Sequence, residues 1–382
     1  MNYIFSIASF SAFFFVALLL GKKPKTLHDR ILVYWLVYLG LFTGLYLFSS
    51  LEFFDRIKQF PAFIVSLFLL HGPFLYLYTS ALTLGKRKLV TQDFLHFLPF
   101  LIFVLYLLIA SRFPGYSAGI RLDHVSTHIR PPLFFVFLLL MTAASGPLYF
   151  ILSIVRVQKH KREYMDNFST AEKINLNWLR ILLYIFGIIW TFLIIIAVTH
   201  HIFHYSSIHF CINGLLLSLS AFIILVGYYG LKQKEIFVHF TVEYPDHHSL
   251  REYTTVTKEK YSSLFLSEKK IAGYVKKINR YMEQEKPFLN PDLTLPLLAS
   301  ELAIPAHHLS RVINEQFEHN FFDFINGYRV EEIKKKLLDP AYDNFSLLGI
   351  AFECGFNSKS AFNRIFKKTT GLTPSEYKKS QA

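Results

Sequence analysis

Seven long apolar runs restrict the fold of this 382-residue chain more than any other feature. Each run has roughly the 17 to 25 residues that a helix needs to cross a hydrocarbon core. Because lipid offers no hydrogen-bond partners, a spanning backbone must satisfy its own polar groups, so helices are expected rather than strands. The sequence therefore predicts a seven-transmembrane helical bundle. Its spans are 3–20, 31–51, 61–84, 94–111, 132–155, 180–200 and 208–231.

Basic residues are unequally shared among the loops between these runs. Loops one, three and five (22–30, 85–93 and 156–180) hold 13 Lys and Arg residues, whereas loops two, four and six hold five. Since positive loops stay on the cytoplasmic side, the N-terminus is predicted outside and residues from 232 onward inside. No basic residue precedes the first run and no small-residue cleavage pattern follows it, which disfavours a cleaved signal peptide.

The net charge of +13 follows the same division of the chain. Residues 1–231 hold 18 basic and 8 acidic residues, a net +10, and residues 232–382 hold 22 and 19, a net +3. Most of the positive excess therefore belongs to the apolar half, where membrane topology explains it. A high isoelectric point is here no argument by itself for nucleic-acid binding.

A second constraint lies near the C-terminus, between Ser346 and Tyr377. Ser346 suits the N-cap of a short helix, and Gly355 suits its end, where a left-handed residue is needed. After the turn, Asn357 or Ser358 is expected to cap a second helix. That helix would bury Ala361, Phe362, Ile365 and Phe366 and expose Lys359, Ser360, Asn363, Arg364 and Lys367. A short helix, a tight turn and a helix with a polar, basic outer face form a helix-turn-helix.

The same pattern occurs once more upstream. Thr294-Leu295, Leu298-Ala299 and Ile304 match Ser346-Leu347, Ile350-Ala351 and Phe356 at an offset of 52. Leu309, Ser310, Arg311 and Ile313 match Phe362, Asn363, Arg364 and Phe366 at an offset of 53. A lone helix-turn-helix pattern is a weak signal, but a duplicated one indicates a DNA-reading module with two units.

At these residues the chain resembles the AraC/XylS family of bacterial transcription regulators, from about Pro291 to Lys379. The second half carries the more specific motifs, IAFECGF, SxSxFNRxFKK and TGLTPSEY. The resemblance implies an all-α domain of two helix-turn-helix units joined by a long helix, expected at Phe321 to Leu338. It also implies two recognition helices in successive major-groove segments of DNA. The implied DNA-binding residues are His307, Ser310 and Arg311 in the first unit and Lys359, Ser360, Asn363 and Arg364 in the second. Lys367, on the same basic face as the second set, is added as a further DNA contact.

The first unit departs from the family pattern in its turn. Ala303 stands where Gly is usual, and Pro305 stands where a Ser cap is usual. These departures concern the angle of the first recognition helix. Among the contacts, Arg311 and Arg364 can bind guanine, and Asn363 can pair with adenine. Lys359, Lys367 and Lys368 suit phosphate.

Four regions follow from these patterns: a sensor-like membrane domain at 1–231, a linker at 232–267, an amphipathic helix at 268–290 and the double helix-turn-helix domain at 291–382. Ser267 is expected to cap the amphipathic helix, whose apolar face holds Ile271, Val275, Ile278 and Met282. Two fates for this face remain open at this stage: packing on the DNA-binding domain, or a contact between two copies of the chain.

No nucleophile–base pair, glycine-rich phosphate loop or paired carboxylates stand out, so no catalytic, cofactor or metal residue is predicted. His200, His201, His204 and His209 cluster at the outer ends of two spans, and an interfacial histidine belt is favoured over a metal site. The alternative is an integral membrane enzyme, metal-dependent through these histidines, with a regulatory or DNA-tethering tail.

The sequence thus predicts a one-component transcription regulator, not an enzyme, embedded as a multi-pass protein in the bacterial inner membrane. Its expected partners are double-stranded DNA, the lipid bilayer, RNA polymerase, a second copy of the chain and a signal ligand of unidentified chemistry.

Overall fold

A computed structural model describes residues 2–48, 60–113, 133–170, 176–201, 208–232 and 267–381. Within these ranges the chain is helical, and its only β-type pairing is an isolated antiparallel bridge between Phe168 and Thr294. The chain divides into two compact units. Unit 1 comprises residues 1–158 and 176–238, and unit 2 comprises 159–175 and 239–382. The all-α class predicted from the sequence is confirmed for the described residues.

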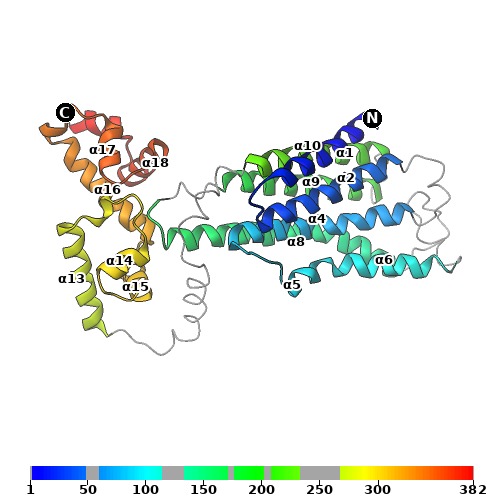
Figure 1. Cartoon of the computed structure of the whole chain (residues 1–382), viewed down its shortest axis with the longest axis horizontal. Helices are drawn as coiled ribbons and strands as arrows, with labels where there is room; N and C mark the ends of the chain where they lie inside the picture. The colour runs from blue at the N-terminus through cyan, green and yellow to red at the C-terminus, as the bar shows by residue number, and fades with distance from the viewer. Residues whose placement is uncertain are drawn as a thin grey trace. The chain divides into compact units, whose positions relative to one another are not determined.

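Unit 1 is built from long apolar helices that run alongside one another (Figure 1). Helix α1 packs against α2 and α10, α2 against α4, α4 against α6, and α9 against α10. Each of the seven apolar runs overlaps a described helix or helix pair. The helices are α1 (Asn2–Gly21), α2 (Leu27–Phe48), α4 (Phe60–Leu84), α5 (Thr91–Phe94) leading through a 3₁₀ turn into α6 (Leu98–Ala110), α8 (Leu133–Met165), α9 (Asn177–His201) and α10 (Ile208–Lys232).

Four of the described helical stretches have the length and hydropathy to cross a membrane, namely 62–84, 91–110, 136–165 and 177–195. Within the apolar stretch of each helix, the buried share is 61% for the first and 22–33% for the other three. Helix α4 is therefore a central helix, and the others have broad free faces. Two shorter apolar stretches, 5–21 and 217–232, accompany them. The number of spans, seven, therefore remains a prediction from the sequence.

Two glycines in unit 1 are positions where an aromatic ring takes the space of a missing side chain. A Cβ on Gly72 of α4 would lie 2.3 Å from the Tyr149 ring of α8, and one on Gly146 of α8 would lie 2.0 Å from the Trp190 ring of α9. Both glycines precede a proline, yet α4 and α8 continue through Pro73 and Pro147. Their role in the structure is therefore close packing between helices.

Unit 2 contains a series of shorter helices (Figure 1). After α13 (Glu268–Gln284) come α14 (Leu295–Glu301) and α15 (Ala306–Gln316), then the longer α16 (Phe321–Leu337), then α17 (Leu347–Glu353), α18 (Lys359–Thr370) and α19 (Pro374–Gln381). Helices α14 and α17 both have seven residues. The long connecting helix predicted at Phe321 to Leu338 is thus α16, one residue shorter.

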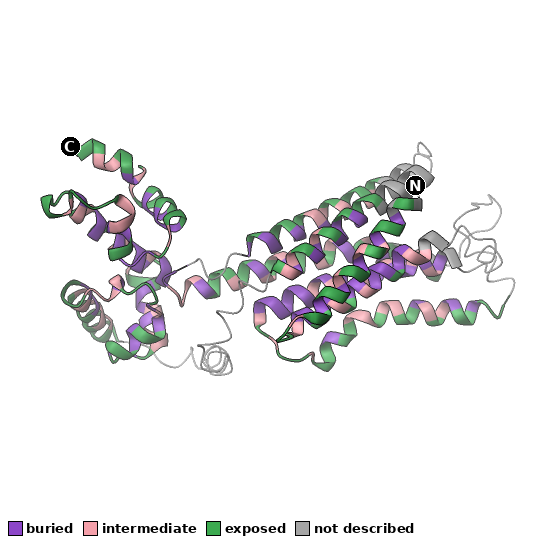
Figure 2. Ribbon diagram, turned by 45° about the horizontal axis from the view of Figure 1, so that its top comes forward, coloured by how far each residue is buried: buried purple, intermediate pink, exposed green. Residues whose placement is uncertain are grey.

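Helix α16 contributes to two separate hydrophobic cores. Phe321, Phe324 and Ile325 belong to a core shared with α13, α14 and α15. Phe322, Val330, Ile333 and Leu337 belong to a core shared with α17 and α18. Ten of the 17 residues of α16 are buried, and buried residues recur along the helices of both units in Figure 2. Each helix-turn-helix pair therefore packs on its own part of one common helix.

Candidate nucleic-acid interface

The second helix-turn-helix has the local geometry that its sequence predicts. Ser346 Oγ accepts a hydrogen bond from Gly349 N at 3.0 Å and caps α17. Ser358, rather than Asn357, caps α18 by accepting from Ala361 N at 3.2 Å. Between them, Gly355 adopts a φ of +87°. A Cβ there would lie 2.5 Å from the Phe288 carbonyl oxygen, so this turn requires glycine for both conformation and space.

Helix α18 presents one apolar and one polar face. Ala361, Phe362, Ile365 and Phe366 are buried in the second core, as the sequence predicts. The five predicted contact residues of this unit are all exposed on the opposite face: Lys359, Ser360, Asn363, Arg364 and Lys367. Lys368 is also exposed, but it pairs with Asp323 at 2.8 Å. The polar face is therefore accessible along the length of the helix.

The first helix-turn-helix repeats this arrangement with different residues. Thr294 caps α14 by accepting from Leu297 N at 3.3 Å. Ala303, the counterpart of Gly355, also adopts a left-handed conformation, with a φ of +48°. Pro305 occupies the N-cap of α15 and supplies no side-chain hydrogen bond. The departures noted in the sequence therefore leave the turn intact, although a left-handed residue with a Cβ is strained.

The predicted contacts of the first unit all lie on α15 but are less accessible. His307, Ser310 and Arg311 are half-buried. Arg311 Nε donates to both carboxylate oxygens of Glu315 at 2.9 Å. The His307 ring packs 4.1 Å from that of His308. Burial, reinforced by the charges of His307, Lys270 and Arg311, lowers the pKa of His308 below its usual value.

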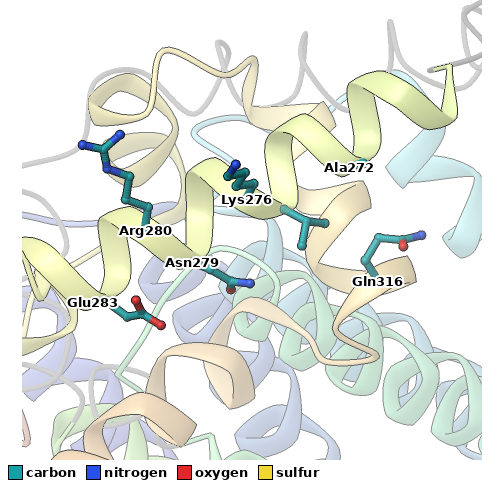
Figure 3. Close-up of a pocket in the computed structure, with 7 residues that line it drawn as sticks. Ala272, Lys276, Asn279, Arg280, Glu283 and Gln316 are labelled. Atoms are coloured by element: carbon teal, nitrogen blue, oxygen red, sulfur yellow. The ribbon is translucent and has the colours of Figure 1, made fainter.

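Helix α13 packs against the first unit. Ile278 and Met282 are buried in the first core, and Val275 packs against it. Ser267 stands at the N-cap but makes no side-chain capping bond. A shallow open pocket lies between α13 and the end of α15, where Asn279 and Glu283 project from one side of α13 and Lys276 and Arg280 from the other (Figure 3). Of the two fates weighed for the apolar face, the structure shows packing on the domain.

A buried polar cluster on α16 is not among the predicted sites. Arg329 is fully buried, and its guanidinium donates to Phe288 O and Asn290 O, each at 2.8 Å. Asn326 and Glu332 are buried on the same helix, and Glu332 pairs with Lys286 at 2.6 Å. Burial lowers the pKa of Arg329 to about 10, which still leaves it charged at neutral pH. In the sequence, the sign of this cluster is the three-residue spacing of Asn326, Arg329 and Glu332, which places them on one face of a helix.

Two other predicted features fall outside the described residues. Residues 233–266 of the linker predicted at 232–267 and the side chains of His200, His201, His204 and His209 are not described. Cys354, the counterpart of Leu302 in the repeat, is buried in the second core, and burial raises the pKa of its thiol to about 11. It is a packing residue, as its position among apolar neighbours suggests.

Comparison with known proteins identifies the C-terminal part of the chain. A family model described as a helix-turn-helix domain matches residues 298–380. These residues form an AraC-type helix-turn-helix domain. The match includes α15, α16, α17 and α18, so it covers both recognition helices and the helix that joins them.

The AraC-type domain accounts for the similarity to named proteins. Two uncharacterized HTH-type transcriptional regulators of Staphylococcus aureus, from strains COL and N315, are 31% identical over 102 residues, 27% of this chain and 13% of theirs. The HTH-type transcriptional activator RhaS of Mannheimia succiniciproducens is 30% identical over 79 residues, 21% of this chain and 28% of that protein. The matched segment thus spans a small part of each relative's length. These relatives are transcription regulators by name, not enzymes.

One solved structure is also similar, that of a Listeria innocua protein of unknown function. It is 29% identical, with 28% of this chain and 95% of that chain covered, at a TM-score of 0.25.

Proposed function

We propose that this protein is a membrane-embedded, one-component transcription regulator that binds DNA sequence-specifically through α15 and α18. The observation that carries the proposal is the duplicated helix-turn-helix, in which two helices with polar outer faces pack on the common helix α16. A recognition helix in each of two joined units is suited to reading two successive segments of the major groove. The match of residues 298–380 to a helix-turn-helix domain supports the same function.

Each predicted contact residue has a distinct chemical role in this proposal. Arg364 and Arg311 bind guanine through paired N–H donors, and Asn363 pairs with adenine. Lys359 and Lys367 contact phosphate, which positions the helix without reading sequence. The remaining polar contacts are His307, Ser310 and Ser360.

The membrane location is supported by apolar side chains exposed on unit 1. On α6, Leu101, Leu105 and Leu108 are all more than half exposed. On α9, Ile188 and Phe192 are exposed to a similar degree. Water disfavours apolar faces of this size, whereas the interior of a bilayer accommodates them. With positive loops inside, the DNA-binding domain is cytoplasmic and the N-terminus lies outside.

In this proposal the helices of unit 1 respond to a signal ligand and alter the DNA affinity of unit 2, which acts with RNA polymerase and as a homodimer. A ligand can do so only if it binds two states of the membrane domain with different affinities.

The test uses the full chain in lipid nanodiscs. A random-sequence duplex pool is enriched by the wild-type protein, and binding of the enriched duplex is measured by fluorescence anisotropy. Arg364→Ala should weaken binding, while Lys335→Ala, a matched change of an exposed basic side chain on α16, should not. Absence of any enriched duplex, or equal effects of the two changes, would contradict the proposal. A C-terminal reporter of a kind that works only in the cytoplasm should be active, and a C-terminal reporter of a kind that works only outside the cytoplasm should be inactive.

A further inference from the structure

A short segment that begins with the last residue of α8 docks on the helix-turn-helix domain. This docking segment, residues 165–169, belongs to unit 2, although residues 176–238 of unit 1 separate it in sequence from the main part of unit 2. Phe168 forms the isolated antiparallel bridge with Thr294. Ser169 N donates to Leu293 O at 3.3 Å, and Asn167 O accepts from Leu295 N at 2.9 Å. The segment therefore pairs with the residues that begin the first helix-turn-helix.

The bond to Leu295 satisfies a donor that α14 leaves unpaired. Leu295 is the first residue of α14, and the first N–H groups of a helix have no carbonyl partner within it. Thr294 caps Leu297 N through its side chain, and the Asn167 carbonyl oxygen supplies the partner for Leu295 N. The start of the first helix-turn-helix is thus completed by a residue from a distant part of the sequence.

The same segment satisfies the buried guanidinium of Arg329. Ser169 O accepts from Arg329 Nη1 at 3.1 Å, and Ser169 Oγ accepts from Arg329 Nη2 at 3.1 Å. Ser169 O also accepts from Asn326 Nδ2 at 3.0 Å, while its hydroxyl donates to Leu293 O at 2.7 Å. A buried charge with missing hydrogen-bond partners is unfavourable. The packing of α16 around Arg329 is therefore expected to depend on the acceptors that Ser169 supplies.

The docking segment also reaches the second unit. Met165, its first residue, packs against the core formed by α16, α17 and α18. Asn167 and Ser169 bind the residues before and at the start of α14. One segment of five residues therefore touches both helix-turn-helix units and the helix that joins them. Met165 is also the last residue of α8, which contains one of the candidate membrane spans.

We propose that residues 165–169 are the intramolecular ligand of the DNA-binding domain, through which α8 controls its DNA affinity. When docked, the segment completes the start of α14 and the partners of Arg329, and it holds the two recognition helices in the arrangement that binds DNA. When withdrawn, it leaves Leu295 N and the guanidinium short of acceptors, and the domain loses affinity. This inference rests on the proposed function, because it explains how the membrane domain regulates DNA binding.

The first experiment compares three full-length variants in nanodiscs. Ser169→Pro removes the N–H that bonds Leu293 O, Ser169→Ala removes only the hydroxyl, and Ser380→Ala removes an exposed hydroxyl that bonds locally to Tyr377 O. Hydrogen exchange of the Leu295 amide reports docking, and anisotropy with the enriched duplex reports affinity. The Kd should rise by about tenfold in Ser169→Pro, less in Ser169→Ala and not at all in Ser380→Ala. Hydrogen exchange of the Leu295 amide should accelerate most in Ser169→Pro, less in Ser169→Ala and not at all in Ser380→Ala.

A second experiment separates docking from general loss of structure. Residues opposite each other in an antiparallel bridge have Cβ atoms at a separation suited to a disulfide. Phe168→Cys with Thr294→Cys is therefore placed in the Ser169→Ala chain, with Cys211 and Cys354 replaced by alanine. Oxidation should restore the affinity lost through Ser169→Ala, and the reduced form of the same protein is the control.

The outcomes distinguish this inference from the proposed function. If no duplex is enriched, the proposed function fails, and exchange at Leu295 still decides whether the segment docks. If the duplex binds but Ser169→Pro leaves its Kd unchanged, the regulatory role of the segment is wrong, whatever exchange shows. Unchanged exchange at Leu295 in Ser169→Pro, or no recovery on oxidation, would equally overturn it.

Discussion

The two helix-turn-helix units have the same helix lengths before the turn but differ in how the turn and the second helix are stabilised. The second unit has Gly355 in the left-handed position, a Ser358 cap and a fully exposed polar face on α18. The first has Ala303 in the left-handed position, Pro305 without a side-chain cap and a half-buried polar face on α15. Packing by α13 and pairing of Arg311 with Glu315 accompany these differences.

This comparison shows that one backbone arrangement tolerates two sets of local interactions when tertiary packing compensates. The first unit lacks the best turn residue and cap, but α13 adds Ile278 and Met282 to its core. The second unit keeps its turn glycine and its serine cap, and the residues added to its core from outside, Met165 of α8 and Tyr377 of α19, are only partly buried. We therefore expect the second unit to dominate DNA recognition and the first to be the more tolerant of turn mutations.

The largest expected difference comes from Gly355→Ala. Its Cβ would meet the Phe288 carbonyl oxygen at 2.5 Å and the Leu289 carbonyl oxygen at 2.9 Å, both backbone atoms that cannot swing aside. We expect the second unit to lose about 3–5 kcal/mol of stability. Hydrogen exchange across residues 347–366 measures it. Unchanged protection there would show that the turn can relax without cost.

Arginine substitutions test the unequal exposure of the two recognition helices. Arg364 is exposed, whereas Arg311 has to release Glu315 before it reaches a base. Arg364→Ala should therefore cost about 1–3 kcal/mol of binding free energy, and Arg311→Ala less. Anisotropy with the enriched duplex measures both. Glu315→Gln should enlarge the effect of Arg311→Ala, and equal losses in all backgrounds would remove the distinction between the units.

Removal of the helix cap should separate the units by a smaller amount. Ser358→Ala deletes the oxygen that accepts from Ala361 N at 3.2 Å, and a lost N-cap typically costs about 1 kcal/mol. Pro305→Ala removes no side-chain hydrogen bond from α15 and serves as the matched change in the first unit. Exchange of the first-turn amides of α18 and α15 is the measurement. A greater effect at Pro305 would contradict the assigned caps.

The smallest expected effect is a gain. Ala303 is left-handed with a φ of +48°, a conformation that glycine adopts without strain, so Ala303→Gly should stabilise the first unit by about 0.5–1 kcal/mol. The greater freedom of glycine in the unfolded chain keeps the gain small. Slower exchange in α14 would confirm it, while faster exchange would show that packing has already relieved the strain at Ala303.

Local sequence was sufficient to predict the helix-turn-helix units because caps, turn glycines and apolar spacing act over a few residues. Ser346, Gly355 and the buried face of α18 lie as their sequence pattern predicts. The offset also changes from 52 to 53 at the turn, where the second unit has one more residue before its recognition helix. The caps and the left-handed turn depend on neighbours within a few residues, whereas the limited space at Gly355 is set by the distant Phe288 carbonyl oxygen.

Contacts between distant residues could not be predicted in this way. Nothing near Ser169 indicates that it binds Arg329, 160 residues away. The pairing of Arg311 with Glu315 was visible as a spacing of four residues, but its consequence for exposure depends on α13 and the packing around α15. Predicted DNA contacts therefore remain predictions of chemistry, whereas their positions on the two helices are structural findings.

Because α16 supplies one wall to each of two cores, neither unit can be detached as an independent folding part. A truncation that ends after α15 would strip away Phe321, Phe324 and Ile325, and one that begins at α17 would strip away Val330, Ile333 and Leu337. Damage to either unit is therefore transmitted to its neighbour. The two helix-turn-helix units are therefore expected to unfold together, because each depends on a core that is completed by the same helix.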